Sequence, residues 1–286
     1  MSSYKRLHLR PDKRLGQHFL IDRNIVNRII ALSGFSSSDV VLEIGPGLGA
    51  VTIPLSRSVR HIVAVEKDRR LIPVLKERLY RADVHNVTLI NQDILSWNFL
   101  DVLDHMCSGS RLKVIGNLPY NISSPLLERM IEQRNMIDRA VVMLQKEVAE
   151  RLTALPETKA YGALTLVVKY YAKASCLLNV QNTAFNPRPK VGSMVIDLDF
   201  RKPYDVGNVQ ENDFVRMVKG AFAHRRKTLI NSLRNAYPDI DSRLFSVIME
   251  RCNIDRKTRA ESLGMDAFLC LISAYSESLN ERVKGQ

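Results

Sequence analysis

The stretch of sequence that decides the fold is Val40-Val41-Leu42-Glu43-Ile44-Gly45-Pro46-Gly47-Leu48-Gly49-Ala50. It begins with a mostly aliphatic run that is typical of a strand buried on both faces of a sheet. The three glycines that follow let the backbone turn tightly and approach a ligand where a Cβ would clash. The stretch therefore predicts a buried strand that ends in a ligand-binding loop.

From residue 39 to about 145, short runs rich in valine and isoleucine alternate with longer amphipathic stretches. The predicted strands are Val40–Ile44, Ile62–Val65, Val87–Ile90, Leu112–Ile115 and Ala140–Leu144. The predicted helices are Asp22–Leu32, with Asp22 as N-cap and Gly34 at its end, Asp68–Tyr80, with Asp68 as N-cap, and Pro125–Arg134. This alternation predicts an α/β fold around a mostly parallel sheet.

Two later apolar runs, 163–180 and 194–200, fit an antiparallel pair at the edge of this sheet. Beyond Pro203 the pattern changes, because residues 211–283 show helical spacing with Asn212 and Asp241 as candidate N-caps. We therefore expect two domains. An α/β domain would span residues 1–203, and a small all-helical domain would span residues 204–286.

The composition points to a polyanionic partner. The 286 residues include 42 Lys and Arg against 30 Asp and Glu, a formal net charge of +12, which favours nucleic acid over a cationic substrate. No apolar run approaches the ~18 residues of a membrane-spanning helix, and the basic N-terminus lacks the apolar stretch of a secretory leader. We expect a cytoplasmic monomer whose four cysteines are reduced, mostly buried thiols. We expect no metal site, because neither Cys nor His shows ligand spacing.

The glycine loop fits two kinds of adenosyl ligand. Gly45-x-Gly47-x-x-Ala50 matches the dinucleotide-binding pattern, which is weak on its own. Glu43, two residues before Gly45, instead completes the Glu-x-Gly-x-Gly-x-Gly arrangement of the class I, Rossmann-like methyltransferases, which bind S-adenosylmethionine. Glu66 and Asp93 follow the second and third strands, where they are placed to accept hydrogen bonds from the ribose hydroxyls and the adenine amine. We predict S-adenosylmethionine as the cofactor.

The segment Gly116-Asn117-Leu118-Pro119-Tyr120 stands at the end of the fourth strand. The exocyclic amine of adenine is a poor nucleophile, because its lone pair is delocalised into the ring. Asn117 Oδ1 and the backbone carbonyl of Leu118 are suited to accept its two hydrogens, while Pro119 fixes the backbone. Tyr120 offers a ring on which an extruded base stacks. The segment predicts methylation of adenine N6 by positioning and hydrogen bonding, without a covalent intermediate.

Six segments together resemble the small-subunit (16S) ribosomal RNA adenine N6,N6-dimethyltransferases, the KsgA-type family. They are the Gly45 loop, Asn117–Tyr120, Arg14–Leu20, Phe185–Ser193, Phe222–Leu229 and Arg259–Leu263. The resemblance implies a cofactor site made of His18, Leu20, Gly45, Gly47, Glu66, Asp93 and Asn117. In it, His18 and Leu20 fold over the methionine end; many relatives carry Asn in place of His18. The resemblance also places Phe185 opposite Tyr120, so that the target base lies between two rings.

The activity implied by this resemblance is dimethylation of two adjacent adenines in the 3′-terminal hairpin loop of small-subunit rRNA, within a pre-30S particle. Basic clusters at residues 5–14 and in the C-terminal domain favour an extended RNA track. The RNA contacts that we predict are Arg14, Lys190, Arg225, Arg226 and Lys227, with the last three in a helical stretch.

Four alternatives stay open on the sequence. A large-subunit rRNA adenine methyltransferase shares the pocket motifs, although the Arg225–Lys227 and Arg259–Leu263 segments favour the small-subunit enzyme. A DNA N6-adenine methyltransferase usually has Pro where Leu118 stands. An RNA-binding assembly factor with little turnover has no need of an intact Asn117–Tyr120 segment. A nicotinamide oxidoreductase lacks a candidate acid or base for hydride transfer.

Overall fold

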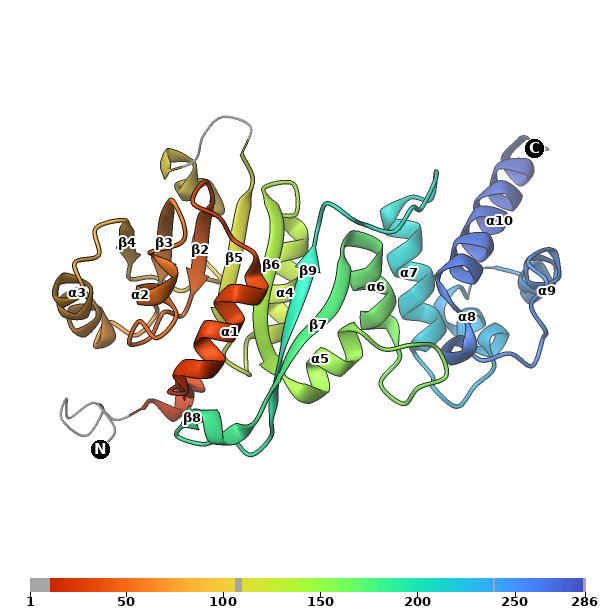
Figure 1. Ribbon diagram of the computed structural model, residues 1–286. Coiled ribbons are helices and arrows are strands. Elements are labelled where there is room, and N and C mark those ends of the chain that lie inside the picture. The colour runs from red at the N-terminus through yellow and green to blue at the C-terminus, as the bar shows by residue number, and fades with distance from the viewer. Residues whose placement is uncertain (1–10, 106–109, 239, 285–286) are drawn as a thin grey trace. The chain divides into compact units, whose positions relative to one another are not determined.

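The computed structural model describes residues 11–105, 110–238 and 240–284. Its central feature is a seven-stranded sheet with the order β4-β3-β2-β5-β6-β9-β7 (Figure 1). The strands are β2 (Val40–Ile44), β3 (His61–Val65), β4 (Val87–Ile90), β5 (Leu112–Asn117), β6 (Ile137–Gln145), β7 (Lys173–Val180) and β9 (Ser193–Asp199). The strands from β4 to β6 are parallel, and β9 runs antiparallel between β6 and β7. The predicted α/β class, with an antiparallel edge, is confirmed.

One predicted strand is wrong. The apolar run 163–180 begins with a helix, α6 (Ala163–Tyr171), and only its second half forms β7 (Lys173–Val180). The buried residues of α6 include Leu166 and Tyr170, four positions apart. A run that is apolar on nearly every side hides this helical period, so a buried helix and a buried strand cannot be told apart by pattern.

Of the five helices of the sheet region, three lie near the predicted positions and two, Thr52–Leu55 and Lys146–Leu152, were not predicted. The five are α1 (Arg23–Ser33), α2 (Thr52–Leu55), α3 (Leu71–Arg81), α4 (Ser123–Glu132) and α5 (Lys146–Leu152). Asp22 caps α1 by accepting from two backbone N–H groups, and Gly34 ends it at φ 61°, as predicted. Asp68 is not the N-cap of α3, because that helix begins three residues later, after Arg70. The Asp68 carboxylate is instead bonded to the Arg70 and Gln17 side chains.

The core of the sheet region joins α1 to one face of the sheet. Val26 and Ile29 of α1 belong to one buried cluster with Val41, Ile115 and Val195, which come from three different strands. All five side chains are at most 5% exposed. Burial of aliphatic side chains at about 25 cal/mol per Å² makes such a cluster a main source of stability for the sheet.

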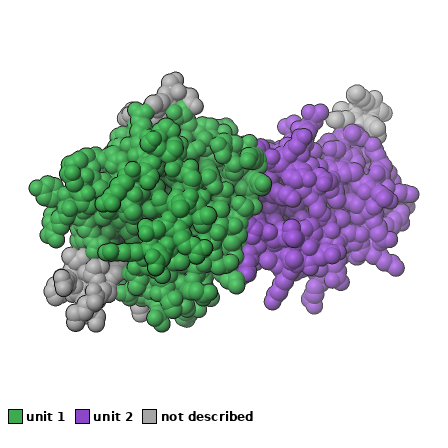
Figure 2. Space-filling model, viewed as in Figure 1, with its two compact units in different colours: residues 1–149, 172–202 green, residues 150–171, 203–286 purple. Residues whose placement is uncertain are grey.

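The chain divides into two compact units according to its internal contacts (Figure 2). One comprises residues 1–149 and 172–202, and the other comprises 150–171 and 203–286. The break after residue 202 lies beside the predicted boundary, but residues 150–171, which we expected in the α/β domain, group with the helical unit. Within that unit the ring of Tyr170 in α6 packs against the ring of Phe214, with centroids 4.5 Å apart and planes tilted by 34°.

The helical unit carries four further helices. They are α7 (Glu211–Phe222), α8 (Leu229–Ala236), α9 (Ser242–Arg251) and α10 (Met265–Lys284). Asp241 caps α9 as predicted, by accepting from Arg243 N. Asn212 is not an N-cap, because α7 begins one residue before it. Four short 3-10 turns complete the described chain: Lys13–Leu15, Phe99–His105, Asn182–Ala184 and Ala260–Ser262.

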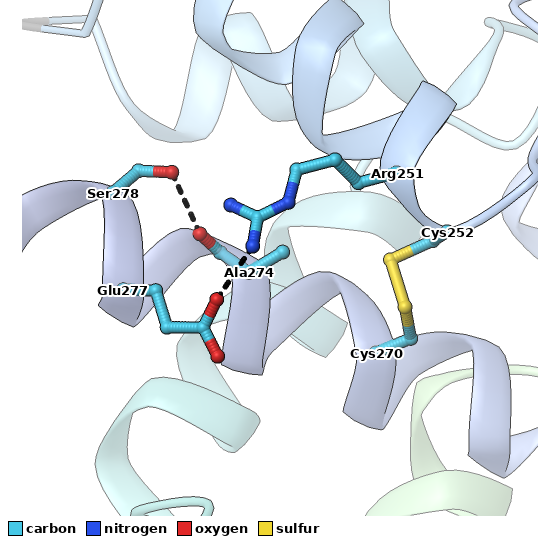
Figure 3. Close-up of a disulfide and its surroundings, with 6 residues drawn as sticks. All are labelled: Arg251, Cys252, Cys270, Ala274, Glu277 and Ser278. Atoms are coloured by element: carbon cyan, nitrogen blue, oxygen red, sulfur yellow. Dashed lines mark hydrogen bonds and ion pairs between the residues drawn. A yellow bond between two sulfur atoms is a disulfide. The ribbon is translucent and has the colours of Figure 1, made fainter.

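The cysteines correct the sequence-based expectation of reduced thiols. Cys252, which ends α9, forms a disulfide with Cys270 of α10, at a Cα–Cα distance of 5.8 Å (Figure 3). Beside it Arg251 donates to Glu277 across the same two helices, at 2.6 Å. Cys176 is a free thiol, and it is exposed rather than buried. Cys107 lies outside the described residues.

Over the described ranges, no helix has the length and apolar character needed to cross a membrane.

Candidate functional site

The site lies at the carboxyl ends of β2 and β5, two neighbouring strands after which the chain continues toward opposite edges of the sheet. The chain runs from β2 through β3 to β4 on one side, and then returns to place β5 on the other side of β2. Ligands of open α/β sheets bind at the carboxyl ends of strands at such a switch point. The register pairs Ile44 with Gly116, so Gly45 and Asn117 emerge side by side. A Cβ on Gly116 would lie 2.8 Å from the Ile44 carbonyl oxygen, so only glycine permits this approach.

The glycine loop is held in place by a hydrogen bond to Glu66 at the end of β3. Gly45 and Gly47 adopt φ angles of 68° and 58°, a region that side chains with a Cβ rarely enter. Gly47 N donates to Glu66 Oε2 at 3.0 Å, and Asp68 N donates to Glu66 Oε1 at 2.8 Å. Burial raises the pKa of Glu66, although these bonds oppose the shift. Glu66 thus ties the loop to the start of the next helical segment.

A pocket of about 1130 Å³ empty volume, open mouth included, surrounds the loop. It contains most of the side chains predicted from the sequence. Its lining includes His18, Leu20, Gly45, Gly47, Glu66, Asp93, Asn117, Leu118, Pro119 and Tyr120. Of the residues predicted for the cofactor or the target base, Phe185 alone is not part of the pocket lining found in the described chain. The structure therefore brings together residues that are up to about one hundred positions apart in sequence.

The orientation of the Asn117 amide is fixed by the N-terminal segment. Asn117 Nδ2 donates to the backbone oxygen of His18 at 2.8 Å. A carbonyl oxygen only accepts, so the NH2 side of the amide must face it and Oδ1 must face the other way. Leu118 is anchored by its own N–H, which donates to Met143 O at 3.0 Å. The segment thus presents a hydrogen-bond acceptor at the pocket from a rigid strand end.

The ring of Tyr120 is held from two sides. Its hydroxyl lies 3.0 Å from Ser193 Oγ, and the His18 ring stacks against it with centroids 5.4 Å apart and planes 29° apart. His18 Nδ1 is 2.8 Å from the carbonyl oxygen of Pro187. Burial raises the pKa of Tyr120, with the Ser193 bond opposing the shift. His18 is thus both a backbone partner of Asn117 and an aromatic neighbour of Tyr120.

Phe185 does not line the pocket found in the described chain. Its side chain is 1% exposed and belongs to the same buried cluster as Leu20 and Ala184. The cause is a two-stranded sheet that pairs β1 (Phe19–Leu20) with β8 (Phe185–Asn186), in which Leu20 faces Phe185. Phe185 is therefore buried rather than open to a ligand, and the His18 ring lies against Tyr120. The placing of the target base between Phe185 and Tyr120 stays a prediction.

Asp93 has a partner that the sequence analysis missed. Its Oδ2 accepts from Lys67 Nζ at 2.6 Å, and its Oδ1 accepts from Leu95 N at 3.1 Å. Burial opposes ionisation, but the hydrogen bonds from Lys67 and Leu95 N and the charge of Lys67 together outweigh it, so the pKa of Asp93 is lowered. Asp93 is an ionised acceptor at the pocket edge. Lys67 directly follows Glu66 at the end of β3. This position, next to a predicted site residue, was the sequence signal that could have identified Lys67 as a site residue.

A hydrogen-bonded latch, also missed from the sequence, holds the N-terminal segment against the pocket. Gln17 Nε2 donates to Asp68 Oδ2 at 2.8 Å, and Gln17 Oε1 accepts from Asp12 N at 2.8 Å. Asp68 also receives a bidentate pair of bonds from Arg70. These bonds, the Arg70 side chain first, lower the pKa of Asp68 to about 2. Because Gln17 precedes His18, the latch sets the position of the carbonyl that orients Asn117.

Glu43 is the one acidic side chain of the pocket with an unsatisfied oxygen among the residues that the structure describes. It is 3% exposed and lines the pocket. Thr52 acts on its carboxyl through hydrogen bonds from its side chain and its backbone N–H, but Oε2 has no hydrogen-bond partner. Burial, together with the charge of Glu66, raises the pKa of Glu43 to about 7. A buried acid beside a second acid suits a ligand that brings positive charge.

The predicted RNA contacts fall into two groups. Arg14, Lys190, Arg226 and Lys227 are exposed. Arg225 is exposed as well, but it is bonded to other residues of the helical unit: Nη2 donates to Lys159 O at 2.7 Å and Nε lies 3.3 Å from Glu261 Oε2. The three residues 225–227 form a turn between α7 and α8 rather than part of a helix. Lys5, Arg6 and Arg10 lie outside the described residues, and no cluster of metal-ligating side chains occurs in the described part of the chain.

Comparison with known proteins places this arrangement in a family. Residues 9–273 match the model of the ribosomal RNA adenine dimethylase family. The ribosomal RNA small subunit methyltransferase A of Desulforapulum autotrophicum is 42% identical over 270 residues, which cover 94% of each chain. The protein of the same name from Bacillus cytotoxicus is 40% identical over 265 residues, 92% of this chain and 90% of that protein.

Solved structures agree with this match. The crystal structure of a dimethyladenosine transferase from Plasmodium falciparum superposes with a TM-score of 0.75 at 27% identity, over 91% of this chain and 98% of that chain. The 23S rRNA methyltransferase ErmE shares the fold, with a TM-score of 0.70 at 24% identity over 90% of this chain and 99% of that one. The chain belongs to the ribosomal RNA adenine dimethylase family.

Proposed function

We propose that this chain transfers methyl groups from S-adenosylmethionine to N6 of two adjacent adenines in the 3′-terminal hairpin loop of small-subunit rRNA. Each adenine receives two methyl groups, during assembly of the small subunit. The choice of subunit is supported by the relatives at 38–42% identity, which are named small subunit methyltransferases. We propose further that the protein works as a monomer in the cytoplasm, where such a particle is assembled.

The pocket residues fit this cofactor. Glu66 stands at the end of β3, with both carboxyl oxygens directed by backbone N–H groups of its own neighbourhood, which suits it to accept from ribose hydroxyls. Asp93 is ionised and suits the adenine amine. The unsatisfied oxygen of Glu43 faces no cation of the described chain. When bound, S-adenosylmethionine supplies an electrophilic methyl group on a positively charged sulfur.

The observation that carries the proposed reaction is the fixed Asn117 amide. Its Nδ2 is engaged by His18 O, so Oδ1 is the atom left to accept one hydrogen of the target amine. The Leu118 carbonyl is proposed to accept the other. Two acceptors in one plane hold the amine so that its lone pair points out of that plane, toward the methyl donor. The proton that leaves N6 after methylation departs to solvent, because Asn117 is neutral and does not take it up.

The target base is proposed to stack on Tyr120. The ring is fixed by Ser193, and base–aromatic stacking contributes roughly 1–3 kcal/mol. Since His18 lies against this ring, the base either takes the place of the imidazole or uses the opposite face. Arg14, Lys190, Arg226 and Lys227 are exposed and are proposed to contact phosphates along the RNA.

The experiment is methyl transfer from labelled S-adenosylmethionine to undermethylated small-subunit particles, followed by primer-extension mapping of the modified nucleotides. We expect dimethylation at two adjacent adenines near the 3′ end of the small-subunit rRNA. Labelling of large-subunit rRNA instead would overturn the assignment of substrate. Absence of labelling in either RNA, with cofactor bound, would overturn the enzymatic proposal.

A further inference from the structure

The most unusual group in the pocket is the carboxyl of Glu43. It is almost completely buried in the middle of the sheet, it lines the pocket, and its Oε2 has no hydrogen-bond partner within the described ranges. A buried polar atom without a partner costs about 1–3 kcal/mol, so this arrangement is stable only if a proton or a ligand charge compensates it.

The sheet register places Glu43 next to the reacting centre. Glu43 pairs with Ile115 of β5, and Asn117 lies two residues further along that strand. Neighbouring strands are about 4.8 Å apart. The Glu43 backbone is therefore one strand spacing from Ile115, which precedes by two residues the amide proposed to hold the target amine. The methyl-bearing sulfur must lie close to that amine for transfer. The positive charge of the sulfonium is therefore brought close to Glu43.

The charges around Glu43 favour a neutral carboxyl before the cofactor enters. Glu66, at the end of β3, is the charged group of the described chain that acts on it, and its charge is of the same sign. Thr52 from α2 and Ile115 from β5, the other named neighbours, carry no charge. Burial and a like charge both oppose ionisation, and together they raise the pKa of Glu43 to about 7.

This inference rests on the proposed function: we propose that the carboxyl of Glu43 responds to the charge of the bound cofactor. Glu43 is protonated in the ligand-free protein and ionises when the sulfonium of S-adenosylmethionine binds. When the cofactor binds, the Glu43 O–H bond breaks, its proton goes to solvent, and the carboxylate is left beside the positive sulfur. In the transfer, the lone pair of adenine N6 forms the new N–CH3 bond while the S–CH3 bond breaks, and the electron pair of that bond stays on sulfur and removes its positive charge. Glu43 takes a proton back from solvent, which favours release of S-adenosylhomocysteine over S-adenosylmethionine.

The test is isothermal titration calorimetry of the full chain with S-adenosylmethionine and, separately, with S-adenosylhomocysteine. Each titration is run in two buffers of different ionisation enthalpy, at about pH 6 and about pH 8.5, which gives the number of protons released. For S-adenosylmethionine we expect close to one proton per site at the lower pH and close to none at the higher pH. For S-adenosylhomocysteine, which lacks the sulfonium, we expect close to none at either pH.

Two isosteric variants assign the proton. Glu43→Gln should abolish the proton release and reduce the preference for S-adenosylmethionine over S-adenosylhomocysteine about 10-fold or more. Glu66→Gln should weaken both ligands alike, because both carry the ribose, and should keep the proton release. Release that persists in Glu43→Gln, or a wild-type chain that releases no proton at the lower pH, would overturn the inference even if the variant folds poorly. A wild-type chain that binds neither ligand would instead overturn the proposed function.

Discussion

Asn117 Nδ2 donates a hydrogen bond to the backbone oxygen of His18 at 2.8 Å, across 99 positions of sequence. This bond determines which end of the amide faces the pocket. It also makes the proposed chemistry at the end of β5 dependent on the N-terminal segment, which is not part of the seven-stranded sheet. The N-terminal segment is in turn held by the hydrogen bond between Gln17 and Asp68. The glycine loop, the latch and Asn117 therefore belong to one connected set of hydrogen bonds.

The latch should contribute measurably to stability. Because the folded-state pKa of Asp68 is lowered to about 2, its ionisation stabilises the fold above the unfolded pKa, near 4, and this contribution is lost as the pH falls toward 2. We expect Asp68→Asn to lower the free energy of unfolding by about 2 kcal/mol at pH 7, and by about half of that at pH 3. Urea unfolding at both pH values measures this. Asp83→Asn, at an exposed aspartate, is the control and should change little; equal effects of the two variants would contradict the role of the latch.

Sequence patterns predicted the parts of the site that are local. The glycine loop, the ends of β2 and β3, and the cap at Asp22 were correct, because each depends on neighbours within a few residues, and β5 continues two residues beyond its predicted end. Local errors occurred at α6 and at the caps Asp68 and Asn212, whereas the tertiary contacts that were missed join distant segments. The pairing of Leu20 with Phe185, the bond from Gln17 to Asp68 and the disulfide between Cys252 and Cys270 depend on tertiary packing, which spacing does not encode.

Glu43 should make the ligand-free protein less stable at alkaline pH. Its folded-state pKa is raised to about 7, so its contribution is fully present below about pH 4.5 and is lost as the pH rises through about 7. Glu43→Gln cannot ionise, and we expect it to gain about 2–3 kcal/mol relative to the wild type between pH 5 and pH 8.5. Chemical unfolding without cofactor at both pH values checks this. Glu77→Gln, at an exposed glutamate of α3, is the matched control. A difference between Glu43→Gln and wild type that does not vary with pH would contradict the buried ionisation.

The two neighbouring arginines of the turn between α7 and α8 should behave differently. Arg226 is exposed, so Arg226→Ala should weaken RNA binding and reduce the slope of log affinity against log salt by about 0.7–0.9, the value for one phosphate contact. Arg225 is bonded to Lys159 O and Glu261, so Arg225→Ala should mainly lower the melting temperature. Filter binding across a salt series, with thermal unfolding in parallel, separates the two. A larger loss of slope in Arg225→Ala than in Arg226→Ala would reverse this assignment.

The disulfide should stabilise the helical unit. Cys252 and Cys270 are 18 positions apart, and a bridge that closes a loop of this size contributes about 3 kcal/mol in the chain-entropy account. We expect Cys270→Ala, or reduction with dithiothreitol, to lower the unfolding free energy of this unit by about that amount. Cys176→Ala, at the free exposed thiol, serves as the control. Thiol labelling of the denatured, unreduced chain should label Cys176 but neither Cys252 nor Cys270, and labelling of both of these would contradict the bridge.

The central claim is that the Asn117 amide holds the target amine, and single-turnover methyl transfer to undermethylated small-subunit particles tests it most directly. The comparison is wild type against Asn117→Ala, with Asn208→Ala, at an exposed position of the helical unit, as the control. We predict that Asn117→Ala lowers the rate of transfer about 10²-fold or more, while RNA binding stays near the wild-type value and Asn208→Ala is fully active. A rate for Asn117→Ala within a few-fold of wild type would contradict the account.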